Sequence, residues 1–107
     1  MTVYKICDEA AWRACEAHGE LPWSQDDVRD GFMHLSSAAQ VPGTLARHFA
    51  GRDGLWLVAV DDACLPALRW EPSRDGQQFP HLYGPLPRAA IVRAAAIAAG
   101  ALPDWLV

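Results

Sequence analysis

Hydrophobic and polar positions alternate at the start of the chain and then change to a helical pattern. Residues 3–7 (Val-Tyr-Lys-Ile-Cys) alternate well enough to predict a first strand. Asp8 follows as a helix N-cap, residues 10–17 are mostly good helix formers, and Gly19 suits a C-cap. Residues 21–30 show no clear period and contain Pro, Trp and three aspartates, so we expect an ordered loop there.

The next segment, residues 32–35, is a short apolar run with a turn signal before it and hydroxyl side chains after it. Such a run predicts a strand. Since side chains alternate along a strand, Phe32, His34 and Ser36 share one face, and the two residues between them face the other way. One apolar face and one face with His and Ser are typical of a strand that carries a site. Asp30, just before the run, belongs either to this site or only to the turn.

A second helix is expected after this strand. Residues 37–40 fit a capping box, with Ser at the cap and Gln three positions later. Apolar residues then recur at every fourth position on one helical face over residues 41–49. Pro42 and Gly43 disturb a regular first turn, so we expect this helix to be kinked or to start late.

The second half of the chain contains further strand-like segments. Residues 55–60 form a continuous apolar run, which predicts a central strand covered on both faces. Residues 67–71 predict a further strand, followed by a polar turn at 72–78. Residues 79–87 contain three prolines and a glycine, which prevent a helix and limit sheet pairing, so we expect a rigid, partly buried segment beside a pocket. Residues 89–99 suit a helix by their alanines and a strand by their Ile and Val.

Composition indicates an ordinary globular protein. The 107 residues are expected to form one domain, with 51% hydrophobic and 21% charged residues. A formal net charge of -4 gives no basic surface for general nucleic-acid binding. No apolar run approaches the roughly 18 residues of a membrane span, and no signal-peptide pattern is visible. Cys7, Cys15 and Cys64 form no CxxC pair, so we expect small buried apolar thiols in a reducing, cytosolic setting.

Polar side chains of functional type lie inside or beside the strand-like motifs. Arginine offers a planar fork to phosphate oxygens, and histidine can donate to phosphate or act as acid or base. Together such residues can hold a ligand that carries phosphate or sugar. The candidates are His34, Ser36, Arg69, Glu71, Ser73, Arg74, His81 and Tyr83.

Each candidate also has a structural interpretation. A lone histidine on a strand, such as His34, is more often a hydrogen-bonded structural residue than a catalyst. Arg69 with Glu71 is more often a solvated ion pair of small energetic value, and Tyr83 between prolines is more often a packing residue. No pair of histidines has the spacing of metal ligands on one helix, so no metal site is predicted. Two histidines are interpreted as surface or helix-edge residues: His18 and His48.

These motifs, in this order, closely resemble the bacterial family called domain of unknown function 952. The resemblance covers nearly the whole chain. It is carried by residues 3–6 (Val-Tyr-Lys-Ile), 30–36 (Asp-Gly-Phe-Met-His-Leu-Ser), 68–74 (Leu-Arg-Trp-Glu-Pro-Ser-Arg) and 79–86 (Phe-Pro-His-Leu-Tyr-Gly-Pro-Leu), with Trp12, Gln40, Thr44 and Phe49. The family is small, cytosolic and functionally uncharacterised. It implies an α+β fold resembling the ADP-ribosyltransferases, with a mixed, split β-sheet flanked by helices around a nicotinamide-dinucleotide cleft.

The resemblance also implies site residues and NAD as a candidate cofactor. Lys5 lies where ADP-ribosyl transferases and RNA 2′-phosphotransferases usually offer a His or Arg from the first strand. His34 and Ser36 resemble an element of the phosphotransferases. Transferases that cleave nicotinamide usually need a late carboxylate, and Glu71 is the only glutamate in the second half of the chain. In that fold the chain returns as a strand, which favours a strand over residues 90–96.

We therefore expect a domain that binds or acts on an ADP-ribose-like or other phosphorylated nucleotide. Arg69 and Arg74 would neutralise phosphate, and Tyr83 would stack on a ring. Glu71 or His81 would serve as acid or base. If it is an enzyme, it would be a transferase of the ADP-ribosyl or 2′-phosphoryl type. The alternative is a non-catalytic module with a degenerate transferase-like fold that binds a protein or a metabolite, and a purely structural role for the histidines is a third interpretation.

Overall fold

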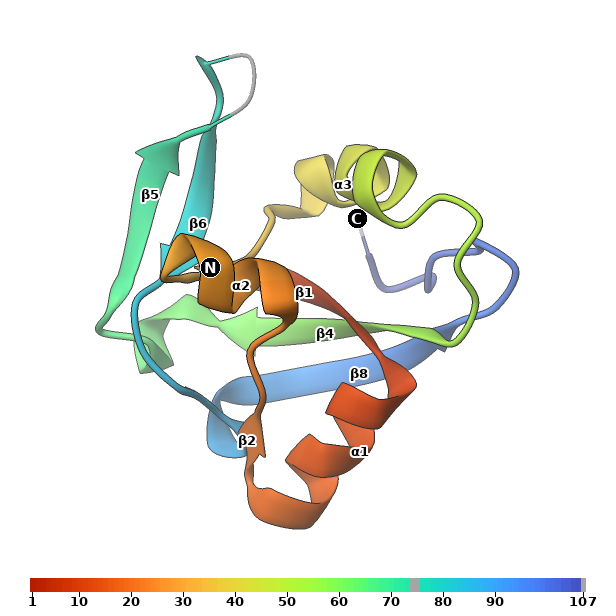
Figure 1. Cartoon of the computed structure of the whole chain (residues 1–107), viewed down its shortest axis with the longest axis horizontal. Coiled ribbons are helices and arrows are strands. Elements are labelled where there is room, and N and C mark those ends of the chain that lie inside the picture. The colour runs from red at the N-terminus through yellow and green to blue at the C-terminus, as the bar shows by residue number, and fades with distance from the viewer. Residues whose placement is uncertain (74–75, 107) are drawn as a thin grey trace.

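The predicted first strand is the edge of a three-stranded sheet (Figure 1). In a computed structural model that describes residues 1–73 and 76–106, β1 (Thr2–Asp8) pairs along its whole length with β4 (Leu55–Asp61). On the other side of β4 lies β8 (Ile91–Ile97), so the order is β1-β4-β8. The apolar run of β4 is therefore the central strand that the sequence predicts.

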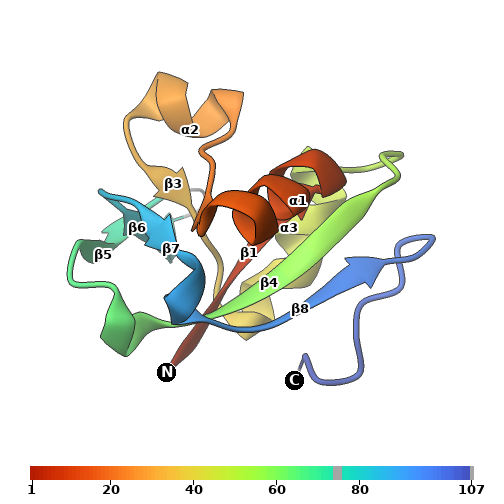
Figure 2. The ribbon, with the colours of Figure 1, turned by 90° about the horizontal axis from the view of Figure 1, so that it is seen from below.

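Two smaller sheets complete the strands. The second sheet has the order β3-β6-β5, formed by β3 (Met33–His34), β6 (Gln78–Leu82) and β5 (Leu68–Pro72). The third is a two-stranded pair of β2 (Glu20–Leu21) and β7 (Leu86–Pro87). Figure 2 shows the β5–β6 hairpin to one side of the sheet that contains β4.

The first two sheets are joined through the free edge of β1. The backbone N–H groups of Tyr4 and Ser36 each donate to the other residue's carbonyl oxygen at 2.8 Å. The N–H of Leu35 donates to the carbonyl of Pro80 at 3.0 Å. The strands of these two sheets thus form one split sheet that is interrupted at this edge of β1. Every strand pair in residues 1–73 and 76–106 is antiparallel, so the expected mixed sheet is wrong. Hairpins such as β5–β6 allow only antiparallel pairing.

The first predicted helix is confirmed as α1 (Glu9–His18). The Asp8 carboxylate accepts a hydrogen bond of 2.8 Å from a backbone N–H of the first turn. Gly19 ends the helix with a φ of 84°, a conformation that glycine adopts without strain. The helix buries Trp12 and Cys15 against the sheet.

The prediction of a loop over residues 21–30 is wrong, because β2 ends at Leu21 and the short helix α2 (Gln25–Asp30) follows. Ser24 caps this helix: the backbone N–H of Asp27 donates to Ser24 Oγ at 3.2 Å, and the N–H of Ser24 donates to Asp27 Oδ2 at 3.0 Å. Gly31, with a φ of 85°, ends it. Six residues are too few to show a helical period, so local capping rather than an apolar stripe defines this element.

The helix expected after the capping box at residues 37–40 begins late, as predicted. The capping box at 37–40 closes a 3₁₀ turn, η1 (Ala38–Gln40), and α3 (Val41–His48) follows it. The apolar face expected over residues 41–49 packs against the outer face of the first sheet. The buried partners there include Tyr4, Ile6, Leu57 and Ile97.

Two predictions about the second half of the chain have opposite outcomes. The prediction that the segment 79–87 has limited sheet pairing is wrong. Its strand β6 is hydrogen-bonded to a strand on each side. Pro80 lacks an N–H, but its carbonyl still accepts from the neighbouring segment. The strand expected over residues 90–96 is confirmed as β8, whose pairing with β4 outweighs the helix preference of its alanines.

Side chains of β4 are buried on both sides of the sheet. Leu57 belongs to one core cluster and Val58 to the other, and both are fully buried. Cys7 and Cys15 are buried as expected, but Cys64 is exposed because it lies in a surface 3₁₀ turn after β4. In the part of the chain that the structure describes, no helix is long and apolar enough to span a membrane.

Candidate functional site

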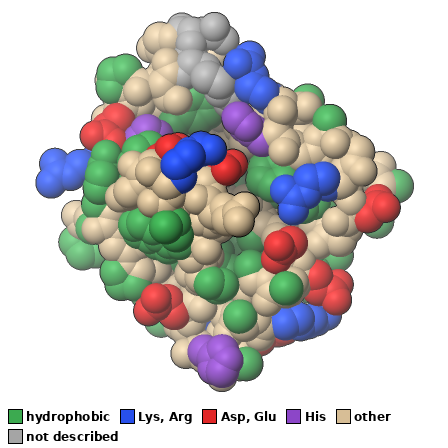
Figure 3. All heavy atoms as spheres, in the orientation of Figure 1, with side chains coloured by type: hydrophobic (Ala, Val, Ile, Leu, Met, Phe, Trp, Pro, Cys, Tyr) green, Lys and Arg blue, Asp and Glu red, His purple; other side chains and the backbone are tan. Residues whose placement is uncertain are grey.

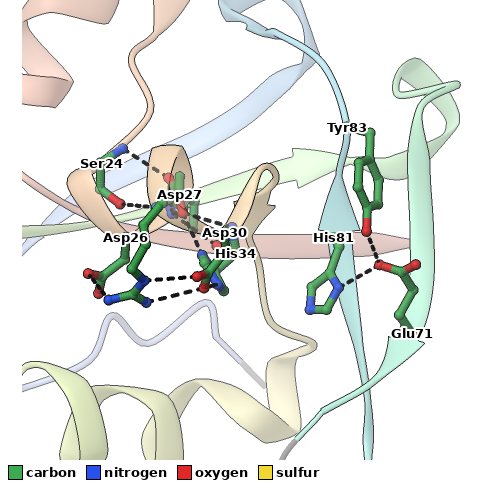
Figure 4. Close-up of polar contacts among 10 residues, drawn as sticks. Ser24, Asp26, Asp27, Asp30, His34, Glu71, His81 and Tyr83 are labelled. Carbon is green, nitrogen blue, oxygen red and sulfur yellow. Dashed lines mark hydrogen bonds and ion pairs between the residues drawn. The ribbon is translucent and has the colours of Figure 1, made fainter.

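Most of the predicted site residues share one face of the β3-β6-β5 sheet. The register pairs His34 with His81, and His81 with Arg69. Directly paired residues in antiparallel strands point to the same side, as do residues two positions apart. Glu71 therefore lies on this face as well, and Tyr83 contacts it (Figure 4). The alternation that the sequence predicts for the first of these strands is thus extended across three strands.

His81 is held by a carboxylate and is almost fully buried, with 6% of its surface exposed. Its Nδ1 lies 2.8 Å from Glu71 Oε1, and the Tyr83 hydroxyl donates to the same oxygen at 2.6 Å. The hydrogen bond from Tyr83, followed by that from His81, lowers the pKa of Glu71. An ionised carboxylate only accepts, so Nδ1 carries the proton and Nε2 of the neutral ring is an acceptor. Figure 4 shows this second nitrogen pointing away from Glu71.

His34 has a carboxylate at each ring nitrogen. Nδ1 lies 2.6 Å from Asp27 Oδ1, and Nε2 lies 2.8 Å from Asp30 Oδ2. Both ring nitrogens are therefore engaged by the protein. A hydrogen bond from Arg29 is the main cause that lowers the pKa of Asp30. His34 and His81 therefore have different environments although their ring centres are 6.0 Å apart.

A buried ion pair lies beneath His34. Lys5 Nζ lies 2.9 and 3.1 Å from the two oxygens of Asp27 and 3.0 Å from the carbonyl oxygen of His34. Lys5 is 5% exposed and Asp27 is 0% exposed. Burial by itself would raise the pKa of Asp27, but the His34 hydrogen bond, the Lys5 charge and the Ser24 backbone N–H outweigh it and lower that pKa. All three N–H groups of the Lys5 ammonium have protein acceptors, so Lys5 supports the site from its buried side.

A cavity of about 240 Å³ opens among α2, α3 and the strands β1, β3 and β6. In Figure 3 histidine, acidic and basic side chains gather on this part of the surface. Aromatic rings of Tyr4, Phe49 and Phe79 form part of the wall. The polar side chains that line it include His34, Ser36, Thr44, His48, Ser73 and His81.

The structure brings some sequence-predicted residues to this cavity and leaves others outside it. Five of them line it: Lys5, His34, Ser36, Ser73 and His81. Three others lie on the same sheet face but do not line the cavity: Arg69, Glu71 and Tyr83. Of these, Glu71 is linked to the cavity by its hydrogen bond with His81. Arg74 lies outside the described residues.

Several lining residues are not expected from the sequence to belong to a site, among them Asp27, Thr44 and His48. Asp27 follows Ser24 with the spacing of a capping box, and this spacing was the one available signal. Thr44 lies on α3, where its Oγ1 is 3.0 Å from Ser36 Oγ. His48 is exposed, as the sequence predicts, but it also lines the cavity. Within residues 1–73 and 76–106, no three His, Cys, Asp or Glu side chains form a group that could hold a metal ion.

Fold and site together define a small α+β protein with antiparallel sheets and a histidine-lined pocket. The chain belongs to the DUF952 family, described as a protein of unknown function, whose profile matches residues 6–94. The family expected from the motifs is thereby confirmed. No curated protein matches the chain.

Solved structures of a bacterial relative share this fold. The crystal structure of protein CC0527 from Caulobacter crescentus is 40% identical, with a TM-score of 0.87 over 97% of this chain and 94% of that chain. A double mutant of CC0527 is 39% identical, with a TM-score of 0.87 and the same coverage. The solution NMR structure of CC0527 gives 40% identity and a TM-score of 0.79 over 96% and 91% of the two chains.

Proposed function

We propose that the cavity binds the ribose phosphate part of a nucleotide-like ligand and that His81 acts on it as an acid–base group. The volume of about 240 Å³ is below the ~300–1,000 Å³ of sites for drug-sized ligands. It suits one part of a nucleotide rather than a whole dinucleotide. Hydroxyl and imidazole groups in the lining can hydrogen-bond sugar hydroxyls and phosphate oxygens.

The environment of His81 is the observation that carries this proposal. Its ring is buried and lines the cavity, and Glu71 holds Nδ1, so Nε2 can accept a proton from a bound hydroxyl or water. Glu71 and Tyr83 act as positioning residues, because they fix the tautomer and the orientation of the ring.

Other side chains have binding or supporting roles in this proposal. Ser36 contacts the ribose or the phosphate, with Thr44 beside it. The His34 ring, whose two nitrogens are held by Asp27 and Asp30, forms part of the cavity wall. Lys5 holds Asp27 and the His34 backbone, so its role is to position the site rather than to touch the ligand. Arg69 is paired with His81 in the sheet register and supplies positive charge near the site.

The contacts of Glu71 and His81 favour one of the two expected transferase types, the 2′-phosphoryl type over the ADP-ribosyl type. Glu71 is the late carboxylate that a nicotinamide-cleaving transferase would need at the ribose, yet it lies outside the cavity lining and is bonded to His81 and Tyr83. The arrangement therefore supports proton transfer at a ribose hydroxyl or phosphate, as in 2′-phosphoryl transfer, over NAD-dependent transfer. The split sheet around the cavity supports the likeness to the ADP-ribosyltransferase fold.

A non-catalytic binding module is the second candidate. The observation in its favour is that His34 and Lys5 already have protein partners at the polar atoms they would offer to a reaction. In that case the cavity would bind the same ligand part without converting it.

Thermal unfolding with ribose 5-phosphate, AMP, ADP-ribose and NAD, each at about 1 mM, tests the proposed function. A ligand present at about 100 times its Kd stabilises the folded state by about 2.7 kcal/mol. For a domain of this size we expect Tm to rise by roughly 10 °C with the ribose phosphate compounds. The rise should be lost in His81→Ala and kept in His18→Ala, which removes an exposed histidine outside the cavity lining.

Turnover measurements separate the two candidates. If ligand is converted, Glu71→Gln should slow the reaction and change its pH profile while the ligand-induced rise in Tm remains. Binding without any conversion would favour the module. No rise in Tm with any of the four compounds would refute both.

A further inference from the structure

A second cavity adjoins the first one. It has a volume of about 310 Å³ and lies between the start of α3 and the end of the β5–β6 hairpin. Thr44 and Phe79 line both cavities, so the two spaces are neighbours at these side chains. The additional lining residues are Ala39, Gln40, Gly43, Arg47 and Gln77.

One wall of this second cavity is made of small residues. Ala39 and Gly43 come from η1 and α3 and carry little or no side chain. A Cβ placed on Gly43 would meet no atom within 4 Å, so the space beside the helix is open. The facing wall comes from Gln77 and from Phe79, whose ring is buried. A slot between small residues and an aromatic ring suits a flat, ring-shaped group.

The polar groups of the slot match the edge of a purine. The Gln40 amide is engaged by the protein, since its Oε1 accepts from Ser37 N at 2.9 Å and its Nε2 donates to the Gln78 carbonyl at 2.8 Å. Gln77 is exposed; its Oε1 accepts a hydrogen bond of 3.5 Å from Gln40 Nε2, and its two amide N–H donors and the second lone pair of Oε1 can serve a ligand. A glutamine amide pairs with the N6 and N7 atoms of adenine through two hydrogen bonds.

We infer that this second cavity binds the purine base of the ligand whose ribose phosphate occupies the first. The inference rests on the proposed function and extends it, because it makes a purine nucleoside monophosphate the smallest ligand that fills the whole cleft. Thr44 and Phe79 then lie at the junction between base and ribose.

Calorimetric titration of the full chain with ribose 5-phosphate, AMP and GMP tests this inference. At least one purine nucleotide is expected to bind tenfold or more tightly than ribose 5-phosphate. Gly43→Leu should abolish this gain and leave the affinity for ribose 5-phosphate unchanged, because the new side chain enters only the slot. Gly43 has no left-handed backbone and leucine is the better helix former, so this variant should fold.

Two further variants sharpen the test. Ala46→Leu places the same side chain at an exposed position of α3 outside the slot and should keep the gain. Gln77→Ala should weaken the purine nucleotide severalfold without changing ribose 5-phosphate. Equal affinities of the wild type for all three compounds, or a gain that survives Gly43→Leu, would overturn the purine site and leave the proposed function standing. Absence of binding by all three would remove the proposed function and this inference with it.

Discussion

Replacing Asp27 by alanine is expected to lower the free energy of unfolding by about 3–5 kcal/mol, because it leaves a buried ammonium group without its counter-charge. Lys5 is 5% exposed and would keep only the His34 carbonyl as an acceptor. The same change removes the acceptor of the His34 backbone N–H and opens the capping box of α2 at Ser24. Thermal unfolding should show Tm lowered by roughly 10–20 °C.

The adjacent residue provides the control for this variant. Asp26 lies on the same helix, is exposed, and pairs with Arg29 at 3.2 Å on the surface. Such a pair is worth about 0–1 kcal/mol, so Asp26→Ala should leave Tm nearly unchanged. Equal losses of stability in the two variants would show that the buried pair is not what holds this region together.

Acidification is expected to remove much of the stability that Asp27 contributes. Burial would raise the pKa of Asp27, yet its hydrogen bonds and the Lys5 charge lower it below the ordinary value of about 3.9. A group with a lowered pKa in the folded state stabilises the fold above its unfolded-state pKa. This contribution is present above about pH 5 and is lost progressively as the pH falls through the unfolded and then the folded value.

Urea unfolding between about pH 2.5 and 7 measures this dependence. The difference in the free energy of unfolding between wild type and Asp27→Asn should be largest near neutral pH and shrink towards pH 3, where the wild-type carboxylate begins to lose its advantage. Asp26→Asn is the matched control and should follow the wild type. A constant difference between wild type and Asp27→Asn over the whole range would contradict a lowered pKa of this group.

These two results would connect stability with the candidate site. The Asp27 carboxylate accepts hydrogen bonds from Lys5 on β1, from Ser24 at the start of α2, and from His34 on β3. One side chain thus fixes three elements around the cavity. His34 is oriented by this network, whereas His81 is oriented separately by Glu71. A variant of His81 should therefore affect ligand binding with less effect on folding than a variant of Asp27.

Local patterns were sufficient for the elements that have a clear period or a strong cap. The strand β1, the capped helix α1 and the central strand β4 were predicted within one or two residues, because each depends on burial of a regular face or on hydrogen bonds between near neighbours. The helix α2 was missed because its six residues show no stripe. The pairing of β6 was underestimated because a proline removes only one donor from a strand with two neighbours.

The sequence by itself determined the family, the α+β class, and the alternation that puts His34 and Ser36 on one face of a strand. Alternation is a property of every strand, so it needed no knowledge of the neighbours. The tertiary structure alone decided which distant residues meet. Lys5 and Asp27 are 22 positions apart in the chain, and the docking of α2 brings them together. Glu71 and His81 are 10 positions apart, and the sheet register brings them together. Because those contacts depend on packing between elements, only the folded chain shows that Lys5 is engaged beneath the site and that His81 faces the cavity.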